Sequence, residues 1–425
     1  MATPLTPAHR TWRIKVFAAT WLSYVGFYYC RKPFTSAKSA IGESMGWSTT
    51  TLGNIYAAYL IAYAIGQFLA SGMGTKLGPR KNVLIGMALS TVVTLGMGIA
   101  PTPAIMAGLV AINGVAQATG WSGNVGTMAS WFHKHERGRV MGMWSTNFTI
   151  GSLTSGWVMA AVLDVYTWES TFFVGAGVLA AVWLQYYFLQ RNTPEDVGLP
   201  AIDDPVTPAD EATTPELPGD GPGGLSKNAW HNLLLVGGFY FFAKFIRYAI
   251  WSWATFFLVR NYGLSDSRAN LYSTMFDLMG LPGVFLTGYI SDKYFGSRRA
   301  GVALIMLVGL SISAAMMIVL RDAGVGVFVG MLGAVGFTLY GPDALLSGAA
   351  AIDIGGRRAA TFATGIIAGF GAMGPIVQEL VISRMYDAKG GDLTPVLILL
   401  TASAAAAMLF CAALVLRNRR GGKGV

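Results

Sequence analysis

Two arginines interrupt apolar segments of this sequence, and each one closes the same short pattern of polar side chains. The spacing is i, i+4 and i+7, which places three side chains on one face of a helix. The two patterns are Tyr24, Tyr28 and Arg31 in the first half and Tyr240, Lys244 and Arg247 in the second. A guanidinium group is a planar fork of N–H donors that matches the oxygens of a phosphate. The patterns therefore predict one anion site to which each half of the chain contributes an arginine.

Other ionisable residues also fall inside apolar segments, where an ionised side chain costs about 3 kcal/mol or more. Lys32 lies about 100° around its helix from the neighbouring arginine, and we expect it to form a gating ion pair with Asp277. Lys244 either contributes to the anion site or pairs with Asp343, whereas Glu379 lies near the end of its segment and is expected to be solvated. The alternative for both arginines is that they form gating salt bridges and never contact a ligand.

Aromatic and amide side chains mark further candidate positions in the apolar segments. Gln117 and Trp121 are four residues apart and share a helix face, Trp144 lies at the start of the next segment, and Tyr340 precedes a Gly-Pro pair. Because aromatic side chains often serve only to fill a core, packing is the alternative at each position. We predict that these four residues line the substrate-binding site together with the two tyrosines of the first pattern.

The composition indicates a protein whose solvent is lipid. Of 425 residues, 53% are hydrophobic and only 12% are charged, whereas soluble domains carry roughly 25% charged residues. The two cysteines, Cys30 and Cys411, lie in apolar segments at opposite ends of the chain, and no cysteine or histidine spacing matches a metal site. We therefore expect no metal, no cofactor and no enzymatic activity.

Twelve segments are long and apolar enough to be transmembrane helices. They are 12–36, 48–71, 82–100, 104–131, 140–163, 169–190, 228–258, 268–291, 300–320, 324–348, 359–383 and 394–416. The polar, proline-rich stretch 191–227 predicts a solvated cytoplasmic linker. The chain is thus predicted to be an all-α membrane protein with a six-helix bundle in 1–190 and a second in 228–425.

The positive charges are distributed unevenly over the connecting segments. With the N-terminus inside, twenty Lys and Arg fall on the inner side, six including Lys38 fall on the outer side, and four lie within helices. Cytoplasmic loops carry the excess of positive charge, so both termini are predicted to face the cytoplasm from a plasma (inner) membrane. This asymmetry explains the net charge of +9 without a nucleic-acid partner, and we expect a monomer.

The two halves repeat, and their motifs resemble those of one family. Arg31 and Arg247 are 216 residues apart, and Arg139 and Arg358 are 219 apart, as in parallel six-helix repeats. The run Tyr28-Tyr29-Cys30-Arg31-Lys32-Pro33-Phe34 resembles the first-helix motif of the organophosphate:phosphate antiporters of the major facilitator superfamily. The resemblance extends to Asn113-Gly114, Gln117, Gly120-Trp121, Met141-Gly142-Met143-Trp144, Thr193-Pro194-Glu195-Asp196, Arg247-Tyr248 and Tyr340-Gly341-Pro342.

The resemblance implies a fold, a reaction and roles for particular residues. It implies the major facilitator fold, with Arg31 and Arg247 holding the phosphate group of the substrate and inorganic phosphate as the counter-substrate. It also implies an ion pair between Lys32 and Asp277. The sequence departs from the family where the organic part of the substrate is expected to bind. There Gln67 stands in place of a lysine, Phe148 of a histidine, and Lys244 and Ala372 of tyrosines. In the first inner loop, Thr75 replaces an acidic residue.

The leading hypothesis is an antiporter that exchanges a phosphorylated small organic anion, such as glycerol-3-phosphate, a sugar phosphate or a phosphoglycerate, for inorganic phosphate by alternating access. One alternative is a membrane receptor of the same fold that senses sugar phosphate. Another is a proton-coupled carrier of a different organic anion in which Asp277 or Asp343 is protonated, although the surplus of buried positive charge argues against it.

Overall fold

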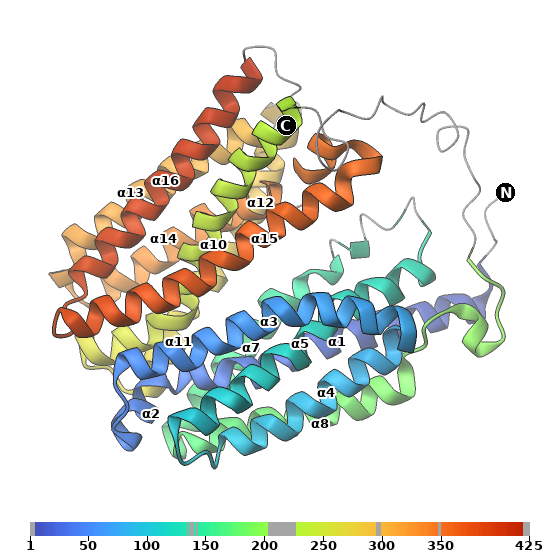
Figure 1. The fold of residues 1–425 in the computed structure, drawn as a ribbon, viewed down its shortest axis with the longest axis horizontal. Helices are drawn as coiled ribbons and strands as arrows, with labels where there is room; N and C mark the ends of the chain where they lie inside the picture. The colour runs from blue at the N-terminus through green and yellow to red at the C-terminus, as the bar shows by residue number, and fades with distance from the viewer. Residues whose placement is uncertain are drawn as a thin grey trace. The chain divides into compact units, whose positions relative to one another are not determined.

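A computed structural model describes residues 5–133, 136, 140–141, 143–202, 227–294, 299–346 and 350–419. Every regular element in these ranges is a helix, as Figure 1 shows. Nine of the helices are long and apolar enough to cross a membrane, and α1, α4 and α12 occupy the remaining three predicted segments. The prediction of an all-helical membrane protein is therefore confirmed.

The chain divides into two compact units. The first contains Met1–Trp47 and Asn54–Thr214, and the second contains Ser48–Gly53 and Pro215–Val425. The helices before the division are α1 (Pro7–Ser36), α2 (Lys38–Met45), α3 (Thr49–Leu77), α4 (Pro79–Met97), α5 (Pro103–Trp131), α7 (Thr146–Val165), α8 (Glu169–Leu189) and the short 3₁₀ helix η1 (Pro194–Val197). Those after it are α10 (Lys227–Tyr262), α11 (Asp266–Ser273), α12 (Met275–Tyr294), α13 (Arg299–Leu320), η3 (Arg321–Ala323), α14 (Val325–Ala344), α15 (Ala350–Ala388) and α16 (Thr394–Arg419).

The same helix pairs pack together in each unit. In the N-terminal unit α1 packs on α7 and α8, while α4 packs on α5 and α8. The corresponding helices of the C-terminal unit repeat this scheme, with α10 on α15 and α16 and with α13 on α14 and α16. Figure 1 shows α13 and α16 running side by side. This correspondence is the structural form of the repeat seen in the sequence.

Two of the predicted transmembrane segments are interrupted by a turn. In the segment 140–163 the turn lies at Ser145, directly before α7 begins at Thr146. The segment 268–291 is divided between α11 and α12 at Thr274, whose N–H donates to the carbonyl of Leu271 three residues earlier and tightens the turn. Hydropathy marks the apolar length of a segment, and it does not register such a local change of hydrogen bonding.

The first part of the predicted linker packs against the N-terminal unit. The Trp131 indole N–H donates to the carbonyl of Arg191 at 3.0 Å, and the Asn192 side chain accepts from the Arg80 N–H at 2.8 Å. His9 Nε2 is hydrogen bonded to the carbonyl of Pro200 at 3.1 Å. Residues 191–202 are therefore not a free linker as the sequence suggested, because the ends of α1, α4 and α5 offer partners for their polar groups. Residues 203–226 lie outside the described part.

Close contact between helices in the N-terminal unit depends on glycine. A Cβ atom at Gly175 of α8 would lie 2.0 Å from the carbonyl oxygen of Tyr29 on α1. Small residues allow such backbone approach in membranes, where packing rather than water drives helix association. Tyr29 lies two residues before Arg31, so this contact sets the distance of the arginine-bearing turn from α8.

Gly175→Ala is expected to lower the free energy of unfolding by about 1–3 kcal/mol, because the added methyl group forces α1 and α8 apart. The matched control is Gly177→Ala on the same helix, where nothing lies within 4 Å of the added Cβ. Thermal unfolding in detergent, followed by intrinsic fluorescence, measures both variants. Equal stability of the two variants would contradict the close contact.

Candidate functional site

Arg31 lies on α1 inside a cradle of aromatic rings. Its guanidinium carbon is 4.8 Å from the centre of the Tyr28 ring, 5.1 Å from that of Tyr63 and 5.9 Å from that of Tyr59. Ring faces attract a cation without neutralising it. Arg31 is only 7% exposed, and its Nη2 is a buried donor with no hydrogen-bond partner among the described residues. Since buried donors are nearly always paired, this nitrogen marks a place where an acceptor is expected to bind.

Gln117 of α5 fixes the orientation of that guanidinium group. Its Oε1 accepts from Arg31 Nε at 2.8 Å and from the Tyr59 hydroxyl at 2.9 Å. Its Nε2 donates to Asn113 Oδ1 at 3.1 Å, and Asn113 Nδ2 in turn donates to the carbonyl of Cys30 at 2.9 Å. The network thus holds both the side chain of Arg31 and the backbone that precedes it. Gln117 is fully buried, so it supports the arginine instead of lining open space.

The other predicted residues of the N-terminal unit form an aromatic group next to Arg31. The Tyr24 ring lies 5.9 Å from Tyr28, 5.4 Å from Trp121 and 6.1 Å from Trp144. Trp144 is fully buried, and its indole N–H donates to the Thr20 hydroxyl at 3.1 Å. Trp121 is 36% exposed. Trp144 therefore packs against Tyr24 from the buried side of the aromatic group, while Trp121 is partly exposed.

Arg247 of α10 has a different environment, because it is paired with a carboxylate. Its Nη1 lies 2.7 Å from Asp343 Oδ2 of α14, and its guanidinium carbon is 4.6 Å from the centre of the Tyr340 ring. The Tyr340 hydroxyl donates to Asp277 Oδ1 of α12. The sequence suggested Asp343 by name as a partner for Lys244 and gave a salt bridge as the general alternative for either arginine; for Arg247 the structure contains such a salt bridge. Periodicity placed both cations on one helix face, but it cannot say which of them a distant carboxylate reaches.

Lys244 completes the polar cluster of the C-terminal unit. Its ammonium nitrogen is 5.2 Å from the centre of the Tyr240 ring and 5.6 Å from that of Tyr248. It lies three residues before Arg247 on α10, on the same helix face. Each unit therefore brings its predicted arginine together with the tyrosines of the same half. Only the C-terminal unit brings a carboxylate to its arginine within the described residues.

Two further charged residues are more buried than the sequence indicated. Glu379 was expected to be solvated but is fully buried, and its Oε2 accepts from Gln378 Nε2 at 3.0 Å. Lys38 was counted in an outer loop but is also fully buried, 5.2 Å from the centre of the Tyr56 ring. The reason is that α15 continues to Ala388 and that α2 begins directly after α1. Both residues are thus part of helices.

Sequence reasoning missed two residues of the Arg31 cradle. Tyr59 and Tyr63 lie on α3 at i and i+4, and this spacing on an apolar helix was the signal that could have identified them. Lys32 is buried, being 3% exposed. Lys32 and Asp277 belong to different units, so their ion pair stays a prediction, as does the convergence of the two arginines on one ligand.

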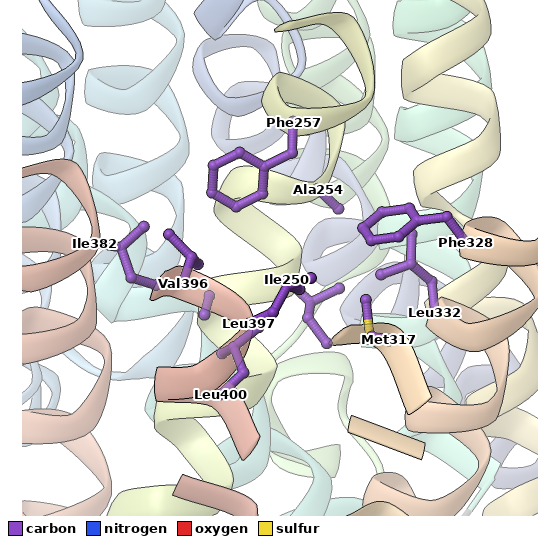
Figure 2. A pocket seen from close by; sticks show the side chains of 11 residues that line it. Ile250, Ala254, Phe257, Met317, Phe328, Leu332, Ile382, Val396, Leu397 and Leu400 are labelled. Carbon is purple, nitrogen blue, oxygen red and sulfur yellow. The ribbon is translucent and has the colours of Figure 1, made fainter. Parts of the chain in front are cut away.

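A small pocket in the C-terminal unit is unsuited to an anion. It lies among α10, α13, α14, α15 and α16, and Figure 2 shows that its lining side chains carry only carbon and one sulfur. Phe257, Met317 and Phe328 are typical of the lining. An unpaired charge in such surroundings would be strongly disfavoured, so the arginine clusters remain the candidate site.

Comparison with known proteins places the chain among membrane transporters. The family model described as "Major Facilitator Superfamily" matches residues 16–377. A glycerol-3-phosphate transporter of Bacillus subtilis is 30% identical over 95% of this chain and 93% of its own length. A probable hexose phosphate transport protein of Chlamydia trachomatis is 27% identical over 86% and 83% of the two chains. The membrane sensor protein UhpC of Escherichia coli is 24% identical over 89% and 87%.

A solved structure shows the same fold. The inward-facing, unoccupied structure of a bacterial homologue of the human lysosomal transporter Spinster covers 96% of this chain and 96% of its own, with a TM-score of 0.69 and 15% identity. At this identity the likeness extends to the fold alone.

Proposed function

Because the chain belongs to the organophosphate:phosphate antiporter family of the major facilitator superfamily, we propose that it exchanges a phosphorylated small organic anion for inorganic phosphate. The observation that carries the proposal is the buried, unpartnered Nη2 of Arg31 in its aromatic cradle. A phosphate oxygen is a suitable acceptor for it, since charge-assisted hydrogen bonds to phosphate are among the strongest in proteins.

The proposed exchange follows from where the two arginines lie. Arg31 belongs to one unit and Arg247 to the other, so one oxyanion that contacts both favours the state in which the units close on it. A ligand shifts a conformational equilibrium only through such differential contacts. Without an anion that contacts both arginines, this contribution to closure is lost, and reorientation of the empty protein is expected to be slow. Alternating access coupled in this way gives exchange of one anion for another.

The proposed substrates are monophosphate esters of small organic molecules. The names of the relatives from Bacillus subtilis and Chlamydia trachomatis specify glycerol-3-phosphate and hexose phosphate, and the shared element of both is the phosphate group. Phosphoglycerates carry the same phosphate group and therefore belong to the same class of candidates. The ligand partners of the protein are accordingly the ester and inorganic phosphate.

The location in the cell follows from the family. The chain is a multi-pass membrane protein, and its bacterial relatives support the plasma membrane. We further propose that both termini face the cytoplasm and that the protein acts as a monomer with two six-helix bundles, 1–190 and 228–425, joined by 191–227. Tagging each terminus and testing its access to a membrane-impermeant reagent checks the orientation.

Proteoliposomes loaded with inorganic phosphate are expected to take up radiolabelled organophosphate at least about tenfold faster than unloaded ones. The physical reason is that only the loaded carrier reorients rapidly. Glycerol-3-phosphate, glucose-6-phosphate and 3-phosphoglycerate form the substrate panel, with protein-free liposomes as the control. Equal uptake with and without internal phosphate would contradict exchange.

The same assay separates the competing functions. Similarity to the sensor of Escherichia coli favours, as a second candidate, a receptor that binds organophosphate but exchanges it slowly. Binding without exchange would support that candidate. Uptake driven by a pH gradient in liposomes without phosphate would instead support the proton-coupled carrier in which Asp277 or Asp343 is protonated.

A further inference from the structure

The two arginines differ in their partners. Among the described residues Arg31 contacts tyrosine rings and Gln117, and its Nη2 has no hydrogen-bond partner. Arg247 donates to Asp343 at 2.7 Å, and the two side chains are 16% and 10% exposed. A buried aspartate therefore already pairs with one terminal nitrogen of the second arginine.

Asp343 resembles a monocarboxylate ligand tied to the protein. Tethering gives a ligand an effective local concentration on the order of millimolar or higher. A free monocarboxylate offers Arg247 the same chemical group and the same charge, so it has no advantage over the tethered one. A phosphate dianion carries twice the charge, and its attraction to a cation is correspondingly greater. Competition with Asp343 thus favours dianions over monoanions.

Displacement of Asp343 does not leave it without a cation. Lys244 is three residues before Arg247 on α10 and therefore lies on the same helix face as the arginine that Asp343 contacts. A buried charge that loses its only partner is strongly destabilised, and Lys244 removes that obstacle. Asp343 also lies in the last turn of α14, where the helix dipole disfavours a negative charge. The ionised carboxylate of Asp343 is consequently stabilised by whichever of the two cations, Arg247 or Lys244, it contacts.

We propose that Asp343 is an internal counter-anion of Arg247. The bound ligand displaces Asp343 toward Lys244, and this competition makes the site selective for dianionic phosphate groups over monocarboxylates. The inference rests on the proposed function, since it concerns the same anion site. It assigns a selectivity role to Asp343, which the sequence suggested only as an ion-pair partner of a buried cation or as a proton acceptor.

Asp343→Asn is the direct test, because asparagine keeps the shape of the side chain and removes its charge. Equilibrium binding of radiolabelled inorganic phosphate to the purified full-length chain is measured with and without D-glycerate as a competing monocarboxylate. The Kd for phosphate is expected to fall at least fivefold, and glycerate is expected to compete in the variant but not in the original protein. The control is Asp322→Asn, since Asp322 is 87% exposed and pairs with Arg321 away from both clusters.

An unchanged or increased Kd for phosphate in Asp343→Asn would overturn the inference, as an increase would mean that the carboxylate positions Arg247 for the ligand. Persistent failure of glycerate to compete in that variant would overturn it as well. These outcomes leave phosphate binding by the original protein intact. If the folded original protein binds no phosphate at all, the proposed function itself fails.

Lys244→Gln provides a second, independent readout. Without Lys244 the displaced carboxylate has no cation, so the Kd for phosphate is expected to rise at least fivefold in the original background and less than twofold in the Asp343→Asn background. Equal increases in both backgrounds would show that Lys244 acts on the ligand directly and would overturn the displacement step. Such a cycle isolates the coupling between the two residues.

Discussion

Arg31→Lys is expected to lower the rate of phosphate exchange at least about a hundredfold, although the positive charge is retained. Lysine offers one compact ammonium group, whereas the Arg31 guanidinium uses Nε for Gln117 and has its buried Nη2 available for an anion. Each lost hydrogen bond to a charged group is worth about 1.5–3 kcal/mol, and about 1.4 kcal/mol corresponds to tenfold. The loss of the Nη2 contact with the anion, together with the loss of the orienting hydrogen bond from Nε to Gln117, therefore reaches the stated factor.

Self-exchange of radiolabelled phosphate in proteoliposomes measures this effect. Arg384→Lys is the matched control, because Arg384 is exposed and its Nη1 donates to the Leu380 carbonyl at 2.9 Å on its own helix. Exchange by Arg31→Lys at the rate of the control would remove the basis for the proposed site.

Gln117→Glu is expected to weaken phosphate binding by about a hundredfold or more with little change in shape. The substitution places a carboxylate 2.8 Å from Arg31 Nε, at the position of the present amide oxygen. Arg31 would then be paired with a buried carboxylate, as Arg247 is with Asp343. A buried ion pair of this kind is hard to separate once formed.

Equilibrium binding of radiolabelled phosphate tests this prediction. The control is Asn228→Asp, which adds the same charge at an exposed position whose side chain accepts from Arg417 Nη2 at 2.7 Å. Gln117→Leu serves as a comparison, because it removes the acceptor without adding charge and leaves Arg31 Nε and the Tyr59 hydroxyl unpaired. Stronger binding by Gln117→Glu than by Gln117→Leu would contradict the electrostatic explanation.

The helices and the Arg31 cluster could be predicted from sequence because each depends on a local pattern. Apolar length gave the twelve segments, and the i, i+4, i+7 spacing put Tyr24, Tyr28 and Arg31 on one face of α1. Gln117 was found through its own spacing with Trp121. Its contact with Arg31, across 86 positions of sequence, follows only from the packing of α1 against α5.

The features that could not be predicted depend on which side chains meet across helices. Asp343 reaches Arg247 and not Lys244 by direct contact, although both cations share one face of α10. The burial of Lys38 and Glu379 depends on where α2 begins and α15 ends, and helix ends are the least regular feature of an apolar segment. Hydropathy treats every charge as a cost and does not identify its partner.

Because the two arginines have different partners, we expect the phosphate group to contact them in a fixed order. Arg31 is held ready by Gln117 and needs no displacement before it accepts an anion. Arg247 must first exchange Asp343 for the ligand. We therefore expect the phosphate group to engage the N-terminal unit first and the C-terminal unit second, with the second contact linked to closure of the units.

The central claim is that the two arginines hold a single phosphate group. Equilibrium dialysis of radiolabelled phosphate against the full-length protein, Arg31→Lys and Arg247→Lys tests it most directly. We expect the original protein to bind one phosphate per chain. At the phosphate concentration that saturates the original protein, we expect neither variant to bind phosphate. Two phosphates per chain, with each substitution removing only one of them, would contradict it.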